Sequence, residues 1–279
     1  MKFLIIGDLH GKKPKIHFKD FDAIIAPGDF CSDDASKYRL KVVKLNYKLK
    51  WFDLVGKKKA LKMIKKSLSD GREVLKYLGS LKIPIYIVPG NWDWTKARNK
   101  YLYWDLKKDF YKSLIRKIPN IIDAHYKSID IGNYQLIGYG DSWGPEYPQS
   151  KKELERHTSQ LENLKKEYKN IYKKVSSLFE KAIKPVIFLT HNVPLNTSLD
   201  KITNKKSPRY GQHYGSLIAR EMIEKYQPLV CIGGHIHEHF GKCKIGKTVC
   251  INAGFGPYVN VLMELENNKI VKLQFHKRK

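Results

Sequence analysis

Residues 233–238 read Gly233-Gly234-His235-Ile236-His237-Glu238 and follow the apolar run Leu229-Val230-Cys231-Ile232. Such a run predicts a buried strand, so two imidazoles stand directly after the carboxyl end of a strand. Side chains two positions apart share a face where the chain is extended, and where it turns they can reach two different metal ions. The glycines in front allow the backbone to pass close to another group. A pair of histidines alone is a weak signal, so the other strand ends decide its meaning.

Metal-binding side chains follow the other apolar runs of the chain as well. The runs at 2–7, 22–27, 84–89 and 185–189 predict strands buried on both faces of a parallel or mixed sheet. The polar residues after these strands and after the run at 229–232 are Asp8, His10, Asp29, Asn91, His191, His235 and His237. Ligands gather at the carboxyl ends of strands in open α/β sheets, and an isolated buried carboxylate is costly unless it is paired or bound to metal. We therefore predict that these residues form one site.

The number and type of these ligands predict two divalent metal ions. Seven protein groups exceed what one ion needs, and two ions about 3.5–4 Å apart that share a carboxylate are usual in phosphate-ester chemistry. Mixed imidazole and carboxylate ligands favour Mn, Fe, Zn, Co or Ni over Mg or Ca. No thiolate stands among them, which argues against a structural zinc site. We expect Mn or Fe, with Ni, Co and Zn as alternatives.

Five short motifs, in this order, resemble the calcineurin-like metallophosphoesterase superfamily. They are Asp8-Leu9-His10, Gly28-Asp29, Gly90-Asn91-Trp92-Asp93, Thr190-His191 and Gly234-His235-Ile236-His237. Asn252-Ala253-Gly254 is similar to a late Asn-Pro-Gly turn of the family, with Ala in place of Pro. The resemblance implies an α/β fold, a four-layer α/β/β/α sandwich of two mixed sheets flanked by helices.

The resemblance also implies a role for each ligand. One ion would be held by Asp8, His10 and His237, the other by Asn91, His191 and His235, and Asp29 would bridge the two. A metal-bridging hydroxide would attack the phosphorus of a phosphoester substrate in line. The candidate catalytic residues are therefore Asp29, Asn91 and His10.

One position departs from the commonest family pattern, in which the residue after the motif's Asn is a His that serves the leaving group or the phosphate. Here it is Trp92, whose side chain cannot act as a general acid. His10 or His213 could substitute, although His213 is also readily explained as an ordinary loop residue. Asp93 either orients a ligand histidine or caps the following helix, and we favour the cap.

The remaining chain predicts one domain over residues 1–279 with helical insertions at about 35–82 and 150–182. Ser69-Asp70-Gly71 predicts a break or a helix cap in the first insertion, and the second predicts one long amphipathic helix or two. A helix is expected at 102–117, and hairpin turns are expected at Gly132-Asn133, at 246–247 and at 266–269.

Composition limits the remaining possibilities. The chain carries 53 Lys and Arg against 27 Asp and Glu, a net charge of +26, which fits either a nucleic-acid partner or a merely lysine-rich surface. No apolar run approaches ~18 residues, so no membrane span is expected. The four cysteines show no CxxC spacing, and the start of the chain runs directly into a strand, so we expect a cytoplasmic protein.

Three functions remain in view. We expect first a dinuclear metal-dependent phosphoesterase, acting on phosphodiesters more readily than on monoesters. The positive charge raises a nuclease as an alternative, and a non-catalytic scaffold of the same fold is another. Trp92, Trp143 and Tyr147 either stack on a flat group of the substrate or pack within their loops.

Overall fold

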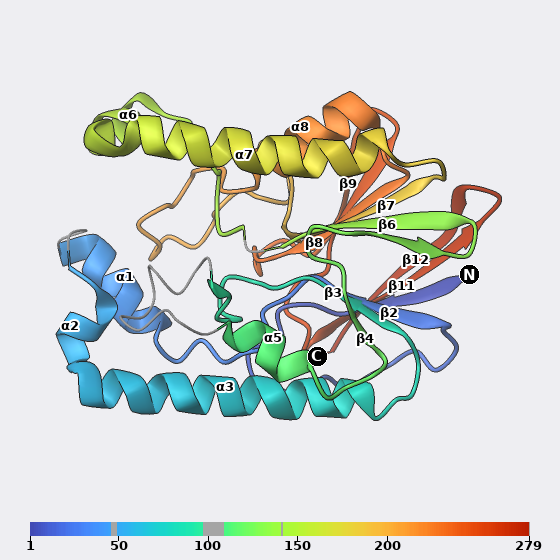
Figure 1. The fold of residues 1–279 in the computed structure, drawn as a ribbon, viewed down its shortest axis with the longest axis horizontal. Helices are drawn as coiled ribbons and strands as arrows, with labels where there is room; N and C mark the ends of the chain where they lie inside the picture. The colour runs from blue at the N-terminus through green and yellow to red at the C-terminus, as the bar shows by residue number, and fades with distance from the viewer. Residues whose placement is uncertain (46–48, 97–108, 141, 279) are drawn as a thin grey trace.

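The computed structural model describes residues 1–45, 49–96, 109–140 and 142–278. Two six-stranded sheets pack face to face, and helices cover their outer faces (Figure 1). Helices α3 (Lys57–Gly79) and α5 (Phe110–Ile115) cover the first sheet, while α7 (Leu161–Glu180) and α8 (Leu217–Tyr226) cover the second. The predicted four-layer α/β sandwich of two mixed sheets is thus confirmed.

The first sheet has the order β12-β11-β1-β2-β3-β4. Its strands are β1 (Lys2–Ile5), β2 (Ala23–Ala26), β3 (Ile85–Ile87), β4 (Ile121–Asp123), β11 (Val259–Glu266) and β12 (Lys269–Lys277). The strands β1 to β4 are mutually parallel, whereas β11 runs antiparallel to both β1 and β12. The carboxyl ends of β1, β2 and β3 therefore meet at one edge.

The second sheet has the order β5-β6-β7-β8-β10-β9. Its strands are β5 (Ser128–Ile131), β6 (Tyr134–Tyr139), β7 (Val186–Asn192), β8 (Val230–Gly234), β9 (Gly241–Ile245) and β10 (Thr248–Asn252). The four central strands are parallel, and β5 and β9 close the two edges in antiparallel pairing. The expected hairpins β5–β6, β9–β10 and β11–β12 are all present.

Alternation along the strands divides the apolar core into layers, because successive side chains point to opposite faces of a sheet. In β1, Phe3 and Ile5 face the space between the sheets, and Leu4 faces the helices outside. A third layer lies under α7 and α8, where Phe179 packs against Phe188 of β7. Both faces of the central strands are covered, which explains their continuous apolar sequence.

The expected break or cap at Ser69-Asp70-Gly71 is wrong, because α3 continues through these residues to Gly79. Gly71 is needed there for its small size. A Cβ added to Gly71 would lie 2.5 Å from the Sγ of Cys31, in the segment that follows the second strand. The glycine therefore lets the long helix pack closely against the loop that carries Asp29.

The other helices within the described residues are short. They are α1 (Ser36–Leu45), α2 (Trp51–Val55), α6 (Lys151–Arg156) and the 3-10 helix η1 (Thr158–Gln160). The second insertion thus contains two α-helices joined by one 3-10 turn. Of the helix expected at 102–117, the structure shows α5, and residues 97–108 lie outside the described part of the chain. Within the described residues, no helix combines the length and the apolar character that crossing a membrane requires.

Candidate metal centre

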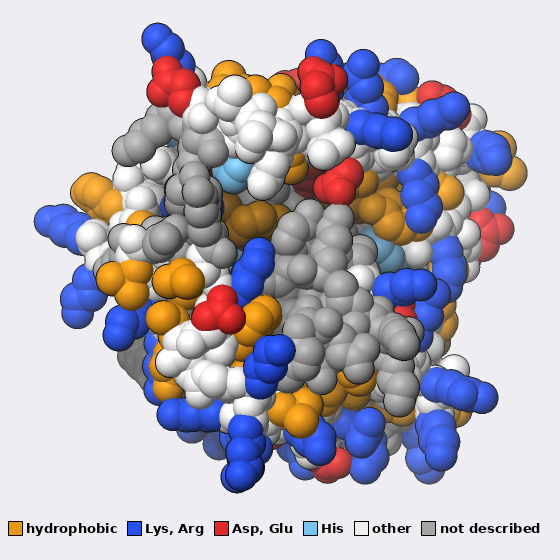
Figure 2. Space-filling model, turned by 60° about the vertical axis from the view of Figure 1, so that its left-hand side comes forward, with side chains coloured by type: hydrophobic (Ala, Val, Ile, Leu, Met, Phe, Trp, Pro, Cys, Tyr) orange, Lys and Arg blue, Asp and Glu red, His pale blue; other side chains and the backbone are white. Residues whose placement is uncertain are grey.

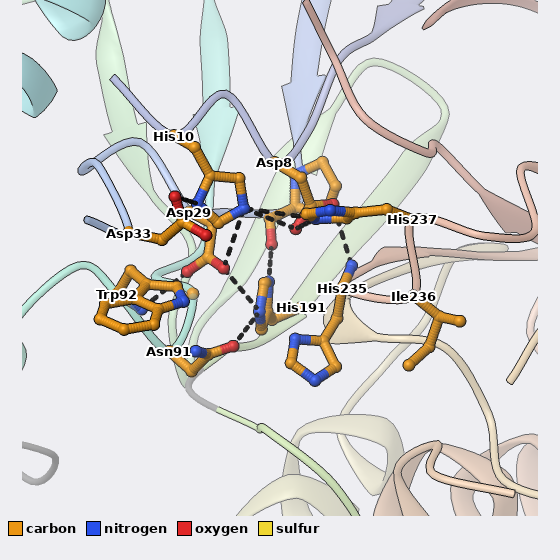
Figure 3. Close-up of polar contacts among 12 residues, drawn as sticks. Asp8, His10, Asp29, Asp33, Asn91, Trp92, His191, His235, Ile236 and His237 are labelled. Atoms are coloured by element: carbon orange, nitrogen blue, oxygen red, sulfur yellow. Dashed lines mark hydrogen bonds and ion pairs between the residues drawn. The ribbon is translucent and has the colours of Figure 1, made fainter. Parts of the chain in front are cut away.

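Two groups of side chains at the carboxyl edge of the sheets could each hold a metal ion. The first group is Asp8, His10 and His237, and the second is Asp29, His191 and His235. The atoms within each group that could bind metal all lie within 4.8 Å of one another. All six come from the set predicted from the sequence, and residues far apart in the chain meet because both sheets place their carboxyl ends here (Figure 3).

In the first group, two imidazoles and a carboxylate converge. Nε2 of His10 lies 3.3 Å from Nε2 of His237, and Nε2 of His237 lies 3.3 Å from Oδ1 of Asp8. The two rings meet edge to face, with centroids 5.0 Å apart. The second carboxylate oxygen of Asp8 accepts a hydrogen bond from the backbone N–H of His235 at 2.9 Å. Asp8 therefore ties the turn of the second sheet to the first sheet.

In the second group, the predicted ligand Asn91 joins the histidines. Its Oδ1 lies 3.1 Å from Nε2 of His191. Nδ1 of His191 lies 2.7 Å from the carbonyl oxygen of Pro27, to which it donates as an N–H. This hydrogen bond fixes the tautomer, so Nε2 presents its lone pair toward Asn91 and Asp29. The ring of His235 meets the ring of His191 at a centroid distance of 5.1 Å.

Asp29 faces both groups with the same oxygen. Its Oδ2 lies 3.6 Å from Nε2 of His10 and 3.6 Å from Nε2 of His191. Its other oxygen, Oδ1, accepts a hydrogen bond from the backbone N–H of Trp92 at 2.7 Å, which fixes the carboxylate plane. One carboxylate oxygen is thus positioned to serve two neighbouring cations.

The backbone at the site adopts a conformation that L-residues rarely take. Asp8, His10, Asp29 and His235 have φ values of 51°, 45°, 57° and 68°, in the left-handed region. Such residues cost free energy and cluster at functional sites, where the surrounding structure holds them in place. The tight turns point side chains that follow one another in sequence into a single small volume.

Glycine makes this close approach possible at two places. A Cβ on Gly90 would lie 2.1 Å from Oδ1 of Asp29, and a Cβ on Gly234 would lie 2.1 Å from Oδ2 of Asp8. Gly234 stands directly before the histidine pair, where the sequence predicts that glycine lets the backbone pass close to another group. The group approached is the carboxylate of Asp8.

Asp93 has a role that the sequence did not predict. It is completely buried, and its two oxygens accept four backbone N–H bonds, from Asp29, Phe30, Cys31 and Gly90, at 2.8 to 3.0 Å. The favoured helix cap is therefore wrong. Asp93 instead holds the loop after β2 against the loop after β3, and so it sets the position of Asp29. The motif places an acidic residue here, but the long-range bonds could not be read from one sequence.

Buried negative charge accumulates in the site. Burial, together with the charges of Asp93 and Asp8, raises the pKa of Asp29 well above its ordinary value. Burial also acts to raise the pKa of Asp8, but His237 and the other histidines outweigh it and lower that pKa to about 2. Burial and His237 lower the pKa of His10 to about 4. Neutral imidazoles beside buried carboxylates are the protonation states that bind metal cations.

Unsatisfied atoms test whether metal ions fit the site. Among the described residues, Oδ1 of Asp8 and Nδ1 of His10 are buried and have no hydrogen-bond partner. Buried polar atoms nearly always have a hydrogen-bond partner. A buried carboxylate oxygen without one, facing imidazole nitrogens, therefore indicates a site for an electron-pair acceptor such as a metal ion. The donor set of imidazole, carboxylate and amide oxygen suits first-row divalent ions. The residues present therefore fit two metal ions.

Two aromatic side chains with cations over them flank the site. Trp92 is 7% exposed, and the guanidinium carbon of Arg39 lies 4.4 Å from the centroid of its ring. On the side of the first group, the ring of Phe255 lies 5.1 Å from that of His237, and Nζ of Lys12 lies 5.3 Å from Phe255. Neither Arg39 nor Phe255 stands in a recognisable motif, so neither was predicted from the sequence.

The other residues considered from the sequence lie in separate contacts. His213 hydrogen-bonds through Nδ1 to Oδ1 of the buried Asp200 at 2.7 Å and belongs to neither metal-binding group. Trp143 meets Tyr214 edge to face at 6.5 Å, and Tyr147 packs at 6.2 Å against Tyr168 of α7.

The loop that carries Trp143 and Tyr147 is held by Glu146, another residue that the sequence did not single out. Glu146 accepts bonds from the backbone N–H groups of Leu217 and Ile218, at the start of α8. Carboxylates are stabilised at helix N-termini, so this contact anchors the loop beside β7.

A four-layer α/β sandwich with two metal-binding groups at the carboxyl ends of its strands is the architecture of metal-dependent phosphoesterases. A sequence model of the calcineurin-like phosphoesterase family matches residues 1–239 of the 279, so the chain belongs to this family. The family uses dinuclear metal centres, in agreement with the two groups described above.

Individual relatives span the whole chain. An uncharacterized protein of Methanocaldococcus jannaschii, MJ1162, is 26% identical over 285 residues, covering 99% of this chain and 97% of the relative. The phosphopantetheinyl hydrolase of Mycobacterium tuberculosis superposes with a TM-score of 0.55 at 12% identity, covering 92% of this chain and 90% of that one. A dimetal phosphatase from Danio rerio gives a TM-score of 0.51 at 10% identity, covering 100% and 99%. At such identities the structural likeness shows the fold alone.

Proposed function

We propose that this chain is a phosphodiesterase that uses two divalent metal ions. The observation that carries the proposal is the position of Oδ2 of Asp29, 3.6 Å from a ring nitrogen of each metal-binding group. A carboxylate shared between two ions is the arrangement that in-line phosphoryl chemistry uses. Membership of a phosphoesterase family supports the reaction class.

We assign the ligands as follows, and the distances within the two groups support the assignment. One ion would be held by Asp8, His10 and His237, the other by Asn91, His191 and His235, with Asp29 between them. Imidazole with carboxylate favours Mn or Fe, with Ni, Co and Zn as alternatives. When bound, such ions supply Lewis acidity that activates water and neutralises charge on the phosphoryl group.

The chain's own residues prepare this site. Asp93 fixes the loop of Asp29 through four backbone N–H bonds, and the Pro27 carbonyl fixes the tautomer of His191. Both restraints are made before substrate arrives, so the ligands need little reorganisation. His10 lies beside Asp29 and Asn91 lies beside His191, and in this proposal both contact the phosphoryl oxygens.

The two aromatic side chains that flank the site, Trp92 and Phe255, support a proposal for the substrate class. Trp92 has no proton that it could give to a departing alkoxide, which favours leaving groups that are stable as anions. A diester also carries only one negative charge, and its second organic group can contact an aromatic ring such as Trp92 or Phe255. We therefore place diesters above monoesters.

The test is hydrolysis of bis-p-nitrophenyl phosphate beside p-nitrophenyl phosphate, in Mn²⁺, with and without chelator. Asp29→Asn removes the shared carboxylate, and Asp130→Asn, an exposed position on β5 paired with Lys184, is the matched control. We expect diester turnover that exceeds monoester turnover, disappears with chelator, falls at least 10²-fold in Asp29→Asn and persists in Asp130→Asn. Equal turnover by Asp29→Asn and wild type would overturn the proposal.

A nuclease is the second candidate. It is favoured by two cationic side chains beside the site, Lys12 over the ring of Phe255 and Arg39 over the ring of Trp92. Lys and Arg side chains also surround the face shown in Figure 2, with few Asp and Glu between them. A polynucleotide substrate predicts binding that weakens steeply as salt rises. Cleavage of a single-stranded oligonucleotide at low salt, lost at high salt, would support this candidate. A chain that binds no metal would instead favour the scaffold.

A further inference from the structure

Three cysteines form a row across neighbouring strands of the second sheet, apart from the metal centre. The strand register pairs Cys231 of β8 with Cys250 of β10, and Cys250 with Cys243 of β9. All three belong to the core layer under α8, so they point to the same face of the sheet. Strand β9 is the edge of the sheet, which places Cys243 at the outer end of the row.

The spacing of Cys243 and Cys250 suits a disulfide bond. Residues directly opposite each other in an antiparallel pair have Cα atoms about 4.5 or 5.5 Å apart. A disulfide needs Cα atoms roughly 4.4–6.8 Å apart, so either kind of pair allows the bond without a large backbone movement. The thiols are free in this structure.

Exposure distinguishes Cys243 from the other two cysteines of the row. Cys231 and Cys250 are fully buried, whereas Cys243 is only partly buried. The Cys231 thiol lies 3.8 Å from Oγ1 of Thr190, and burial raises its pKa to about 12. A buried thiol that keeps its proton is a poor nucleophile. Cys231 is therefore inert.

Cys243 has the properties of the attacking thiol. Contact with the Cys250 thiol lowers the pKa of Cys243, and the hydroxyl of Thr197 acts in the same direction. The thiolate is the reactive form of cysteine, and access from solvent is the second requirement. Cys250 lies directly across the strand pair and is placed to resolve a bond formed on Cys243. Contact with Cys243 and burial raise the pKa of the Cys250 thiol, and the larger of these two causes, the contact with the Cys243 thiol, ends once Cys243 has formed a mixed disulfide.

We propose that Cys243 and Cys250 are a redox-active dithiol that forms a reversible disulfide by exchange with a low-molecular-weight disulfide. The Cys243 thiolate attacks the small disulfide and forms a mixed disulfide, releasing one small thiolate. The Cys250 thiol then loses its proton and attacks Sγ of Cys243, releasing the second. In sum, two protein thiols are oxidised to one disulfide and the small disulfide is reduced to two thiols.

The position of the pair connects it to the metal-binding turn. Strand β9 begins at Gly241, directly after the turn that carries His235 and His237. Strand β10 ends at Asn252, whose Nδ2 donates to the carbonyl oxygen of Ile236 at 2.8 Å. The disulfide would close only a short hairpin and so would add little stability through chain entropy. Because Cys243 is partly exposed, the disulfide is expected to be readily reduced. The proposal does not depend on the proposed phosphodiesterase activity.

The experiment uses the full chain, metal-free and reduced, and oxidised glutathione as the probe. We expect the four thiols to fall to two, with a mass loss of two hydrogens that dithiothreitol reverses. Peptide mapping should find Cys243 joined to Cys250. Retention of all four thiols, a glutathione that stays on Cys243, or a bond to any other cysteine would overturn the proposal.

Two variants sharpen the test. Cys250→Ser should stop the reaction at the mixed disulfide on Cys243, because the resolving thiol is gone. Cys231→Ala keeps the pair and should react like the wild type, which controls for loss of a buried thiol from the same row. A wild-type rate in Cys243→Ser would show that this thiol is not the one attacked. Mapping of the wild-type chain decides the proposal even if a variant does not fold.

Discussion

Oδ2 of Asp29 lies 3.6 Å from Nε2 of His191, and the same oxygen lies 3.6 Å from Nε2 of His10 on the other side. The two histidines belong to different candidate metal-binding groups; His10 follows β1 of the first sheet, and His191 lies on β7 of the second. Asp29 therefore contacts one histidine that follows the first sheet and one that lies in the second sheet. The consequences for stability, metal affinity and catalysis can each be measured.

The first prediction concerns Asp29→Asn and thermal unfolding. In the metal-free protein, burial and the charges of Asp93 and Asp8 raise the pKa of Asp29 above its unfolded value. A carboxyl group whose pKa is raised in the folded state stabilises the fold at pH values below the unfolded pKa. This stability is lost as pH rises through the folded pKa, so near neutral pH the buried charge of Asp29 destabilises the fold. Asp29→Asn should therefore unfold at a higher temperature than the wild type in chelator.

The same variant should respond differently to metal. Mn²⁺ should raise the unfolding temperature of the wild type and of the control Asp130→Asn, because a ligand that binds only the folded state stabilises it. Asp29→Asn should gain little. Differential scanning fluorimetry measures both effects, and an equal gain in all three proteins would contradict the shared role of Asp29.

The second prediction is that affinity for Mn²⁺ falls as pH is lowered. Burial lowers the pKa of His237, but Asp8 outweighs it and raises that pKa above the ordinary value, and the pKa of Asp29 is also raised. Protons bound to these ligands must leave when metal binds. Affinity should drop roughly tenfold per pH unit for each proton displaced from His237 and Asp29. Calorimetric titration from about pH 8 to pH 5.5 measures the slope, and a flat profile would refute the assignment.

The third prediction concerns Asp93→Asn. Each oxygen of Asp93 accepts two backbone N–H bonds. In an asparagine one of these oxygens is replaced by an NH₂ group, which cannot accept. Whichever way the amide is oriented, two backbone N–H groups therefore lose their acceptor. Leaving buried donors unsatisfied costs about 1–3 kcal/mol each, so we expect a loss of about 2–6 kcal/mol in unfolding free energy. Urea denaturation tests this. Asp20→Asn, where the side chain is 83% exposed, should change stability little.

The fourth prediction is that Trp92→His extends activity to poor leaving groups. An imidazole at this position can donate a proton to a departing alkoxide, a contribution of about 10²–10⁴-fold where the acid is well placed. The ratio of kcat/KM for an alkyl phosphodiester to that for bis-p-nitrophenyl phosphate should therefore rise at least tenfold. Trp92→Phe controls for loss of the indole and its contact with Arg39. A ratio that stays at the wild-type value in both variants would exclude the role assigned to this position.

The sandwich and the clustering of the candidate metal ligands were predictable because both depend on local signals. Each ligand follows an apolar run, and the carboxyl ends of parallel strands meet at one edge whatever the loops between them. His10 and His235 illustrate this, since a strand end and one tight turn place each of them. The five motifs then supplied the pairing of ligands, which spacing alone left open.

Long-range hydrogen bonds and close packing were not predictable. Asp93 was expected to cap a helix, but its partners at Asp29, Phe30 and Cys31 lie more than 60 positions away. Gly71 resembles a helix break in sequence, and only its contact with Cys31 shows why a glycine stands inside a continuous helix. Tertiary contacts outweigh local propensity at both positions.

The most direct test of the central claim is the metal content of the purified chain after loading with Mn²⁺ and removal of excess ion, measured by inductively coupled plasma mass spectrometry. The account predicts two ions per chain for the wild type and about one for His191→Ala, which removes a ligand from the second group only. One ion per chain in the wild type, or no loss in His191→Ala, would contradict a dinuclear centre built on these residues.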